Sequence, residues 1–147
     1  MGDNMNKALL TIHNITVGTY DVDFAGHVSN LSYLRWLEDM RLKLFDNFFP
    51  LAKFIEKGLV PVIASTKIDY KKTIRLFDKP IGYMWIDSLG AASIKISACI
   101  LMNSVVTTEA SHVAVFIDQS SGKPVKVPQE IISAFINYKP VQGPIIF

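Results

Sequence analysis

The chain has 147 residues, 50% of them hydrophobic, and a formal net charge of +2 at pH 7. This length suits one domain with a sizeable core, the small charge argues against a nucleic-acid partner, and no apolar run reaches the roughly 18 residues that a membrane span needs. The mean hydropathy of +0.28 is high for a soluble monomer, so we expect extra apolar surface to be buried in an oligomer.

A strand followed by a long helix is predicted for the first third of the chain. Segment 9–20 is rich in Leu, Ile, Val and Thr, which predicts a strand, and Gly18 marks a bulge or a close backbone approach near its end. From Leu31 to about Phe49 apolar residues recur near helical spacing, and Pro50 stops the helix. The recurring apolar residues are Leu31, Leu34, Leu37, Met40, Leu42, Leu44, Phe45 and Phe48.

A short helix, four strands and a closing helix are predicted for the rest of the chain. The expected elements are a helix over 51–57 ended by Gly58, strands over 62–74, 81–89, 93–102 and 105–117, and a helix over 129–138 after Pro128. Turn signals separate them at 78–80, 90–92 and 118–124. Alternation in the strand over 62–74 places one set of side chains on the same face: Val62, Ala64, Thr66, Ile68 and Tyr70. We expect the tail, 139–147, to be extended or loosely held.

This order of elements predicts an α+β fold in a single domain. Short connections between the later strands imply an antiparallel meander, and the amphipathic helix must bury its apolar stripe against the apolar face of a twisted sheet. We therefore expect a sheet wrapped around one central helix. The domain covers 1–147, with its core at about 9–138.

Polar residues crowd into one stretch between the first strand and the long helix. Asp21 and Asp23 lie on the loop that leads into the helix, followed by Gly26, His27 and Asn30. An asparagine just before an apolar periodic run is a helix start signal. The amides and the dipole of a helix N-terminus favour negative charge and carbonyl oxygens, so we interpret this stretch as an active-site loop.

The stretch from Asp21 to Tyr33, which reads Asp-Val-Asp-Phe-Ala-Gly-His-Val-Ser-Asn-Leu-Ser-Tyr, resembles a family signature. The signature, Asp-x-Asp-x-x-Gly-His-Val-x-Asn-x-x-Tyr, is that of hot-dog-fold acyl-CoA thioesterases of the 4-hydroxybenzoyl-CoA thioesterase type. The order of elements extends the likeness over 11–138. The resemblance implies a curved five-stranded antiparallel sheet around the helix, a homodimer or homotetramer built by sheet extension, and active sites at the dimer interface.

Position by position, the resemblance also implies roles for the loop residues. Asp23 matches the catalytic carboxylate, and Asp21 matches an acidic neighbour that is usually not catalytic. Gly26 and His27 fall where backbone amides polarise a thioester carbonyl. Plant acyl-carrier-protein thioesterases have a similar stretch that uses an Asp, an Asn and a His, but Ala25 stands where that Asn would be. This departure argues against the three-residue mechanism, so a chemical and a structural role for His27 both stay open.

The chemistry of thioester hydrolysis supports the same assignment. The reaction needs a base or nucleophile beside the carbonyl carbon, and donors aimed at the developing oxyanion. A Gly-containing turn into a helix supplies N–H groups that point outward. We therefore hypothesise that Asp23 is the base or nucleophile and that the amides of Gly26, His27 and Val28 form the oxyanion hole.

Substrate contacts are expected from the helix start, from the strands and from lysines. The predicted substrate-binding residues are Asn30, Tyr33, Phe24, Ser65, Thr66, Ser93, Lys71 and Lys126. The candidates for the phosphates of coenzyme A are Lys67, Lys71, Lys72, Arg75, Lys123 and Lys126, although solvated surface charge is the commoner explanation. Aromatic-type relatives carry arginines at the turn before Ser93, whereas this chain has none there. The carrier, coenzyme A or acyl carrier protein, therefore stays open, as does the acyl group.

Two other functions remain as alternatives to hydrolysis. A hot-dog dehydratase or hydratase would need an Asp and a His acting as a pair across a carbon–carbon bond, which Asp23 and His27 on one loop fit less well. A non-catalytic module that binds acyl thioesters is the second, and the retained Asp23 argues against it. Glu38 is the next candidate carboxylate, because related hot-dog families place one on the helix.

No cofactor is expected apart from the coenzyme A of the substrate, and no metal site. His13 and His112 sit alone in strand patterns, without a cluster at ligand spacing. The single cysteine, Cys99, excludes an intramolecular disulfide, suits a reducing compartment and is flanked by apolar residues typical of an inert core thiol. Since 1–7 lacks a signal-peptide pattern, we expect the protein in the cytoplasm and not at a membrane.

Overall fold

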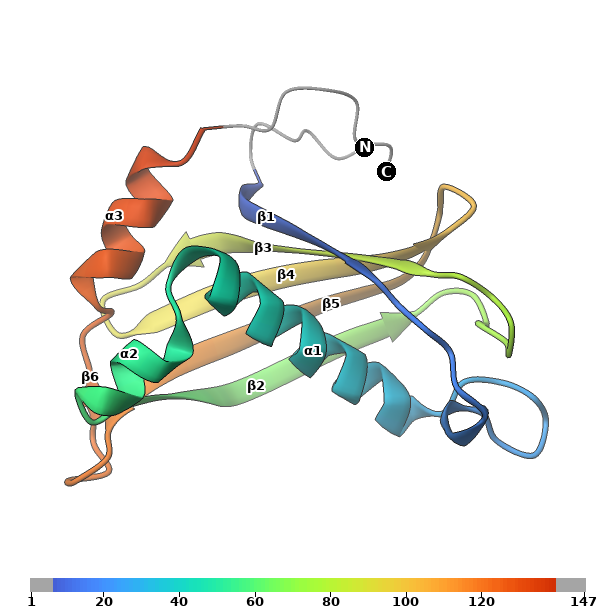
Figure 1. Ribbon diagram of the computed structural model, residues 1–147, viewed down its shortest axis with the longest axis horizontal. Helices are drawn as coiled ribbons and strands as arrows, with labels where there is room; N and C mark the ends of the chain where they lie inside the picture. Colours follow the sequence, from blue (N-terminus) through green and yellow to red (C-terminus); the bar gives the residue numbers. More distant parts are fainter. Residues whose placement is uncertain (1–6, 140–147) are drawn as a thin grey trace.

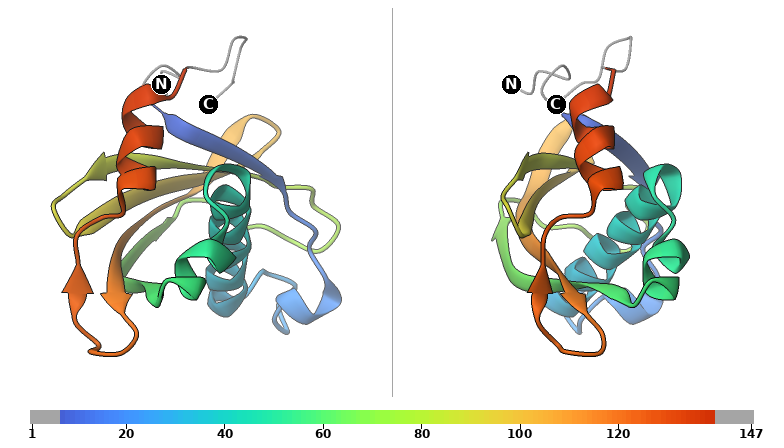
Figure 2. Two further views of the ribbon diagram at one scale, coloured as in Figure 1. Left: turned by 60° about the vertical axis from the view of Figure 1, so that its left-hand side comes forward. Right: turned by 90° about the vertical axis from the view of Figure 1, so that its left-hand side faces the viewer.

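One curved antiparallel sheet packs against a long helix in the computed structural model, which describes residues 7–139 (Figure 1). The elements are β1 (Ala8–Asn14), the 3-10 turn η2 (Thr19–Asp21), α1 (Asn30–Phe48), α2 (Leu51–Glu56), β2 (Leu59–Tyr70), β3 (Ile81–Leu89), β4 (Ser93–Met102), β5 (Val105–Asp118), β6 (Pro124–Val125) and α3 (Gln129–Asn137). The strand order is β1-β3-β4-β5-β2, and β6 pairs with β5. This is the predicted α+β hot-dog arrangement, and Figure 2 shows the sheet curving around one side of α1.

Local sequence signals predicted most of these elements. Strands β3 and β4 have the expected bounds, and α1 begins one residue before its predicted start. The N-cap of α1 is Ser29, so Asn30 is the first helical residue and not the cap. The predicted helix over 129–138 ends at Asn137. The predicted tail lies outside the described residues except for Lys139.

The buried stripe of α1 differs from the predicted one. Tyr33 and Trp36 join the core, whereas the leucines at the start and on one side of the helix stay exposed. The buried hydrophobic residues of α1 are Tyr33, Trp36, Leu37, Met40, Leu44 and Phe45, and the exposed ones are Leu31, Leu34, Leu42 and Phe48. Gly82 on β3 lets the helix approach, because a Cβ there would lie 2.7 Å from the sulfur of Met40.

The first strand is shorter than predicted. It ends at Asn14, and the amide of Ile15 makes a last contact with the carbonyl of Pro80 at 3.0 Å. The chain then turns through η2, where the Gly18 amide donates to the Asp21 carboxylate at 2.7 Å. The prediction of a strand to residue 20 is therefore wrong, because this side-chain contact replaces the strand ladder with a turn.

Strand β2 departs from the prediction in bounds and in facing. It begins before Pro61, which is tolerated because β2 is an edge strand, and it ends at Tyr70. A register shift between Ile63 and Ser65 places Val62 opposite Val115 but Thr66 opposite His112. Since His112 is buried and Val115 is not, Val62 and Thr66 lie on opposite faces of the sheet. The predicted common face for these residues is wrong for this reason.

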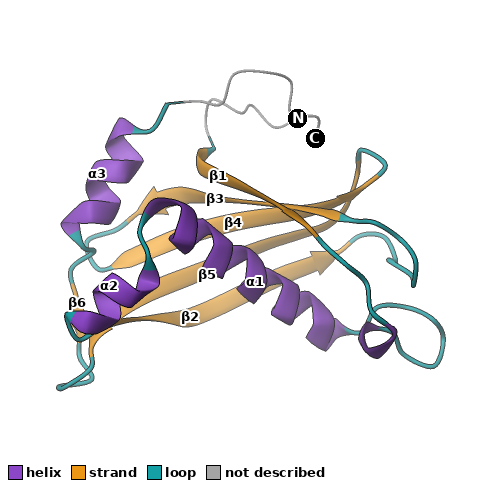
Figure 3. Ribbon diagram, in the orientation of Figure 1, coloured by secondary structure: helices purple, strands orange, loops and turns teal. Residues whose placement is uncertain are grey.

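Two long connections gather at the end of the sheet where α1 begins. They are 15–29, which contains η2, and 71–80, which joins β2 to β3 (Figure 3). The turn predicted at 78–80 lies earlier, because the Asp78 amide donates to the carbonyl of Arg75 at 3.2 Å. The two-residue strand β6 was not predicted. No helix within the described residues is long and apolar enough to cross a membrane.

Candidate active site

The Asp23 carboxylate organises its own loop. Its Oδ1 accepts the amides of Ala25 at 2.9 Å and of His27 at 3.1 Å. The backbone closes the same turn, since Gly26 donates to the Asp23 carbonyl at 3.0 Å and Asp23 donates to the His27 carbonyl at 2.8 Å. Gly26 has a φ of +77°, which favours glycine. Oδ2 of Asp23 has no donor among the described residues, so one carboxylate oxygen stays open to a ligand.

The loop is tied to the connection between β2 and β3. Val28 donates to the carbonyl of Ile74 at 2.9 Å, and a β-bridge joins His27 to Arg75. Ile74 is fully buried and anchors this contact in the core. The two connections therefore form one structural unit, although their contacting residues are far apart in the sequence.

A polar pocket of about 290 Å³ opens beside Asp23. Its lining residues come from the loop, from the first turn of α1 and from the end of β2: Asp23, His27, Val28, Asn30, Tyr33, Tyr70, Lys71, Lys72 and Thr73. Six of the predicted site residues meet here: Asp23, His27, Val28, Asn30, Tyr33 and Lys71. The pocket thus holds a carboxylate, an imidazole, an amide side chain and two cations.

Asp21 and Asp23 have different surroundings, although one residue separates them. Asp21 is buried, and its carboxylate accepts the Gly18 amide. The carbonyl of Asp21 also accepts the amide of Ser29 at 2.8 Å and the hydroxyl of Ser32 at 3.3 Å. Asp21 therefore holds the loop against the start of α1, whereas Asp23 is exposed beside the pocket.

The three amides predicted to form an oxyanion hole are engaged within the protein. Gly26, His27 and Val28 donate to the Asp23 carbonyl, the Asp23 carboxylate and the Ile74 carbonyl. In this conformation none of them is free to bind an oxyanion. Among the described residues, no acceptor is recorded for the amides of Asn30 and Leu31, in the first turn of α1. The sequence signature did not single out this pair of donors.

Tyr33 and Phe24 occupy opposite environments. Tyr33 is 3% exposed and packs edge-on against Trp36 and Tyr70, with ring centroids 5.3 and 4.9 Å away. Burial raises the pKa of its hydroxyl, although hydrogen bonds with the Ile74 backbone and the Thr108 side chain act in the opposite direction. Phe24, at the tip of the loop, is fully exposed and lines no part of this pocket.

The two predicted strand residues point to different faces of β2. Ser65 pairs with Val113 on the outer face, and Thr66 pairs with His112 on the face toward α1. The Thr66 hydroxyl lies 3.3 Å from Nδ1 of His112, while Nε2 of that buried ring has no partner in the described chain. Burial, with a smaller contribution from the Arg41 charge, lowers the pKa of His112 to about 4. The imidazole is therefore neutral at pH 7.

Ser93 and Lys126 lie far from Asp23 within one chain. Tyr70, at the pocket, pairs with Thr108 on β5, and Ser93 pairs with Val115. Seven residues of strand separate these two points, a distance of roughly 23 Å. Lys126 follows β6, which pairs with β5 one residue further along, at Phe116. Only a second subunit could bring either residue to the pocket.

Tyr70 and Thr73 line the pocket but were not among the predicted site residues, whereas Lys72 lines it as one of the predicted candidates for a phosphate contact. No local motif marks them, because their position follows from the pairing of β2 with β5 and from the contact of Val28 with Ile74. The lysine cluster at 71–72 was the signal in the sequence that pointed to this region.

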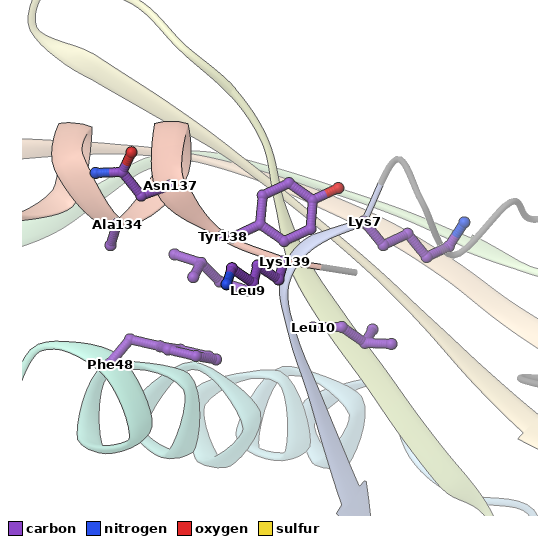
Figure 4. Close-up of a pocket in the computed structure, with 8 residues that line it drawn as sticks. All are labelled: Lys7, Leu9, Leu10, Phe48, Ala134, Asn137, Tyr138 and Lys139. Carbon is purple, nitrogen blue, oxygen red and sulfur yellow. The ribbon is translucent and has the colours of Figure 1, made fainter. Parts of the chain in front are cut away.

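A second, mainly apolar pocket lies at the other end of α1 (Figure 4). It has a volume of about 330 Å³ and contains none of the signature residues; Leu9, Phe48 and Ala134 are among those that line it. The 18 residues between Asn30 and Phe48 separate the two ends by roughly 27 Å. This pocket is therefore distinct from the one beside Asp23.

No group of three or more metal-ligating side chains is found in the part of the chain that the structure describes. Cys99 is buried on β4, where burial raises the pKa of its thiol to about 12. A thiol with this pKa carries almost no thiolate at neutral pH, so Cys99 is a poor nucleophile.

Comparisons with known proteins support the same family as the loop signature. The family model described as the thioesterase-like superfamily matches residues 17–135. The fold is shared with a DHNA-CoA thioesterase from Staphylococcus aureus, at a TM-score of 0.80 and 19% identity, covering 86% of this chain and 89% of that one. A predicted thioesterase from Bacillus stearothermophilus is 25% identical, with a TM-score of 0.77 and coverage of 90% and 99%.

A third similar structure was solved with a ligand. The thioesterase from Thermus thermophilus, complexed with coenzyme A and Zn, has a TM-score of 0.76 and 24% identity, covering 89% of this chain and 94% of that one. Among curated proteins none gives a significant match. Because the family model spans most of the domain, including the whole Asp23 loop and α1, this chain belongs to the thioesterase-like superfamily.

Proposed function

We propose that the protein hydrolyses an acyl-CoA thioester to a free carboxylic acid and coenzyme A. The observation that carries this proposal is the open Oδ2 of Asp23, at the edge of a pocket that also contains Lys71 and Lys72. Hydrogen bonds from two backbone amides to Oδ1 fix the carboxylate in this position. A fixed carboxylate beside a cationic rim suits a thioester whose carrier bears phosphates. Membership of the family supports the same reaction.

Asp23 acts on the thioester carbonyl as a base or as a nucleophile. As a base it takes a proton from water, which attacks the carbonyl carbon, and collapse of the tetrahedral intermediate expels the thiolate. As a nucleophile it attacks the carbonyl carbon and the C–S bond breaks, which releases the thiolate and leaves a mixed anhydride that water then cleaves. The amides of Asn30 and Leu31 lie at the N-terminus of α1 and have no acceptor between residues 7 and 139, so they supply oxyanion donors without any rearrangement of the loop.

The amides of Gly26, His27 and Val28 would contribute only after an exchange of hydrogen bonds. The His27 amide is the nearest case, because its acceptor is the reacting carboxylate itself. A shift of Asp23 toward the substrate would release that donor. The movement of Asp23 and the release of the His27 amide would then be parts of one step. The His27 imidazole either transfers a proton in the reaction or supports the loop.

The active unit is proposed to be a dimer formed through β2. Within the described chain β2 is an edge strand of the sheet, and most of its residues from Ser65 to Tyr70 are exposed. Leu42 of α1, which is 45% exposed, lines a small pocket together with Pro61 and Ile63 of β2. Sheet extension here would bury this apolar surface. Contacts of Ser93 or Lys126 with the substrate would then come from the partner subunit.

Hydrolysis is tested with a panel of acyl-CoAs and a release assay for free thiol. The panel includes short, long and hydroxyaromatic acyl groups, because two structural relatives are described as DHNA-CoA and gentisyl-CoA thioesterases. We expect Asp23→Asn to slow turnover by about a hundredfold or more. Asparagine keeps an Oδ1 acceptor for Ala25 and His27, so the fold is retained.

The matched control is Asp118→Asn, at the end of β5. Asp118 makes a comparable turn, in which its Oδ1 accepts the Ser120 amide at 2.8 Å, but it lies outside the pocket. We expect this variant to keep full activity. A fully active Asp23→Asn variant would exclude Asp23 as base or nucleophile. If acyl-CoA binds without turnover, the non-catalytic binding module or the dehydratase replaces the hydrolase.

A further inference from the structure

The connection between β2 and β3 borders a third pocket, which the proposed chemistry does not use. Its residues Tyr70 to Thr73 line the pocket of Asp23, whereas Phe77 to Ile81 line a cavity of about 510 Å³ against the segment Asn14–Val17. The bond from the Ile15 amide to the Pro80 carbonyl holds its two walls together. A volume of this size is in the range of ligand pockets.

Phe77 has an unusual conformation in this cavity. It is the third residue of the turn that begins at Arg75, and its φ is +72°. Turns with a positive φ at this position usually have glycine there, and a bulky side chain is strained. Phe77 is also 84% exposed, so burial in the core does not compensate for the strain. Strained residues of this kind concentrate at ligand sites.

The charge of the connection favours an anionic ligand. Between Tyr70 and Pro80 the chain has four cations and one acid, while the whole protein has a net charge of only +2. The acid, Asp78, already accepts the amide of Arg75 at 2.8 Å. Lys71 pairs with Glu109 at 3.6 Å, but Lys72, Arg75 and Lys79 make no ion pair within the described residues. Phosphate groups are the ligands that such exposed cations bind best.

We propose that the cavity lined by Phe77 binds the nucleotide of the coenzyme A thioester. The adenine would stack on Phe77, and the phosphates would lie beside Lys72, Arg75 and Lys79. An aromatic ring stacks on any base without needing a fixed hydrogen-bond pattern. Asn14 and Thr16 place an amide and a hydroxyl at the same cavity, as partners for the base edge and the ribose.

The two pockets are close enough for one substrate. Thr73 and Phe77 are four residues apart and lie at most ~14 Å from each other, which an extended pantetheine arm can span. The thioester would then lie at Asp23 while the nucleotide occupies the cavity of Phe77. This assignment rests on the proposed hydrolysis and selects coenzyme A as the carrier, since a carrier protein presents no adenine.

Phe77→Gly is the decisive variant, because binding and stability should change in opposite directions. Glycine accepts the positive φ, so we expect the melting temperature to rise or stay constant. Loss of the stacking ring should weaken binding of coenzyme A about tenfold in calorimetry. Phe77→Leu keeps the strain and an apolar side chain, and we expect it to lose similar affinity without gaining stability.

Lysine variants test the phosphate contacts. Lys79→Gln should weaken coenzyme A binding, and the loss should shrink at high salt. Lys53→Gln removes the same charge from the exposed side of α2, outside this cavity, and should bind coenzyme A as the unchanged protein does. Equal effects of the two variants would mean a general charge effect and would overturn the assignment.

Kinetics with matched substrates separate this inference from the proposed function. For one acyl group, the ratio of kcat/KM for acyl-CoA to that for acyl-pantetheine should fall about tenfold in Phe77→Gly, through KM. An unchanged ratio, or a loss confined to acyl carrier protein substrates, would overturn the nucleotide site.

If no thioester is cleaved, the hydrolase proposal fails, but calorimetry with coenzyme A and ADP still tests whether the cavity binds the nucleotide. Equal affinity of the unchanged protein and Phe77→Gly, or no binding, would reject it.

Discussion

The two ends of α1 use the same residue type in opposite ways. At the C-terminal end, Phe49, Phe54 and Phe116 are almost fully buried, and their ring centroids lie 5.2–6.3 Å apart in tilted or edge-on pairs. At the N-terminal end, Phe24 and Phe77 are 105% and 84% exposed. The first end stabilises the domain. The second leaves two apolar rings in water, Phe24 at the tip of its loop and Phe77 at the cavity that it lines, an arrangement that stability alone would not favour.

The largest expected effect contrasts two phenylalanines. Phe54→Ala should lower the free energy of unfolding by about 3–5 kcal/mol, because it removes a ring from the aromatic cluster and leaves a cavity. Phe24→Ala should change it by less than about 0.5 kcal/mol, since the ring is exposed. Urea unfolding measures both. Comparable losses in the two variants would show that the Phe24 loop is packed against something in solution.

The second prediction concerns the buried histidine between the two ends. The pKa of His112 is lowered from 6.5 to about 4 by burial, with the Arg41 charge acting in the same direction. As the pH falls below 6.5, the unfolded chain binds a proton that the folded protein rejects. The contribution of His112 to the free energy of unfolding is therefore fully present above pH 6.5 and is lost as the pH falls toward 4, by about 3 kcal/mol in total.

Urea unfolding of the unchanged protein and of His112→Asn between pH 7 and pH 5 tests this pH dependence. Above pH 5 few carboxyl groups change their protonation. Burial also lowers the pKa of His13, but His13 is present in both proteins, so the difference between the two slopes reports His112. The variant starts from a lower stability, but its stability should change less with pH. Identical slopes in the two proteins would contradict the assignment.

A smaller effect separates the two glycine turns. Gly26 and Gly122 have φ values of +77° and +70°, and an added Cβ would meet no atom within 4 Å at either position. Alanine should therefore cost about 1–2 kcal/mol of stability at both sites, from the backbone alone. Only Gly26→Ala should also slow hydrolysis, because its turn positions Asp23. Equal activities in the thiol-release assay would remove the loop geometry from the mechanism.

The smallest effect is expected at an exposed ion pair far from the pockets. Lys57 and Glu130 join α2 to the start of α3 at 2.9 Å, with both side chains more than half exposed. Their coupling in a double-mutant cycle should be below about 0.5 kcal/mol and should decrease with salt. A coupling above about 1 kcal/mol would mean that the C-terminal end depends on charge as well as on its aromatic cluster.

The sequence predicted the elements whose signals are local. Strands β3 and β4 have the predicted bounds because apolar alternation and a turn at Gly90 define them within a few residues. The facing of β2 could not be predicted, because the shift at Ala64 appears only when the strand pairs with β5. The stripe of α1 was mispredicted because leucines that stay exposed on the folded domain resemble core residues in a sequence.

For the candidate site, too, the sequence predicted only what is local: which residues of the loop lie together. The loop signature located Asp23, His27 and Asn30 at one pocket because they are neighbours in the chain. Their partners from 70–73 come from a contact between Val28 and Ile74, which no local pattern encodes. The engagement of the Gly26 to Val28 amides is likewise a property of the folded loop, and the signature is silent on it.

The hydrogen bond from the Val28 amide to the Ile74 carbonyl has a consequence for protein engineering. It ties the loop that holds Asp23, the proposed catalytic carboxylate, to a connection that holds the cations, so we expect that neither can be exchanged alone. A graft of the 15–29 segment from a relative with another substrate would need its native 71–80 partner to keep this register. Specificity in this fold should thus be transferable between relatives only as a pair of segments, and insertions in one should require compensating changes in the other.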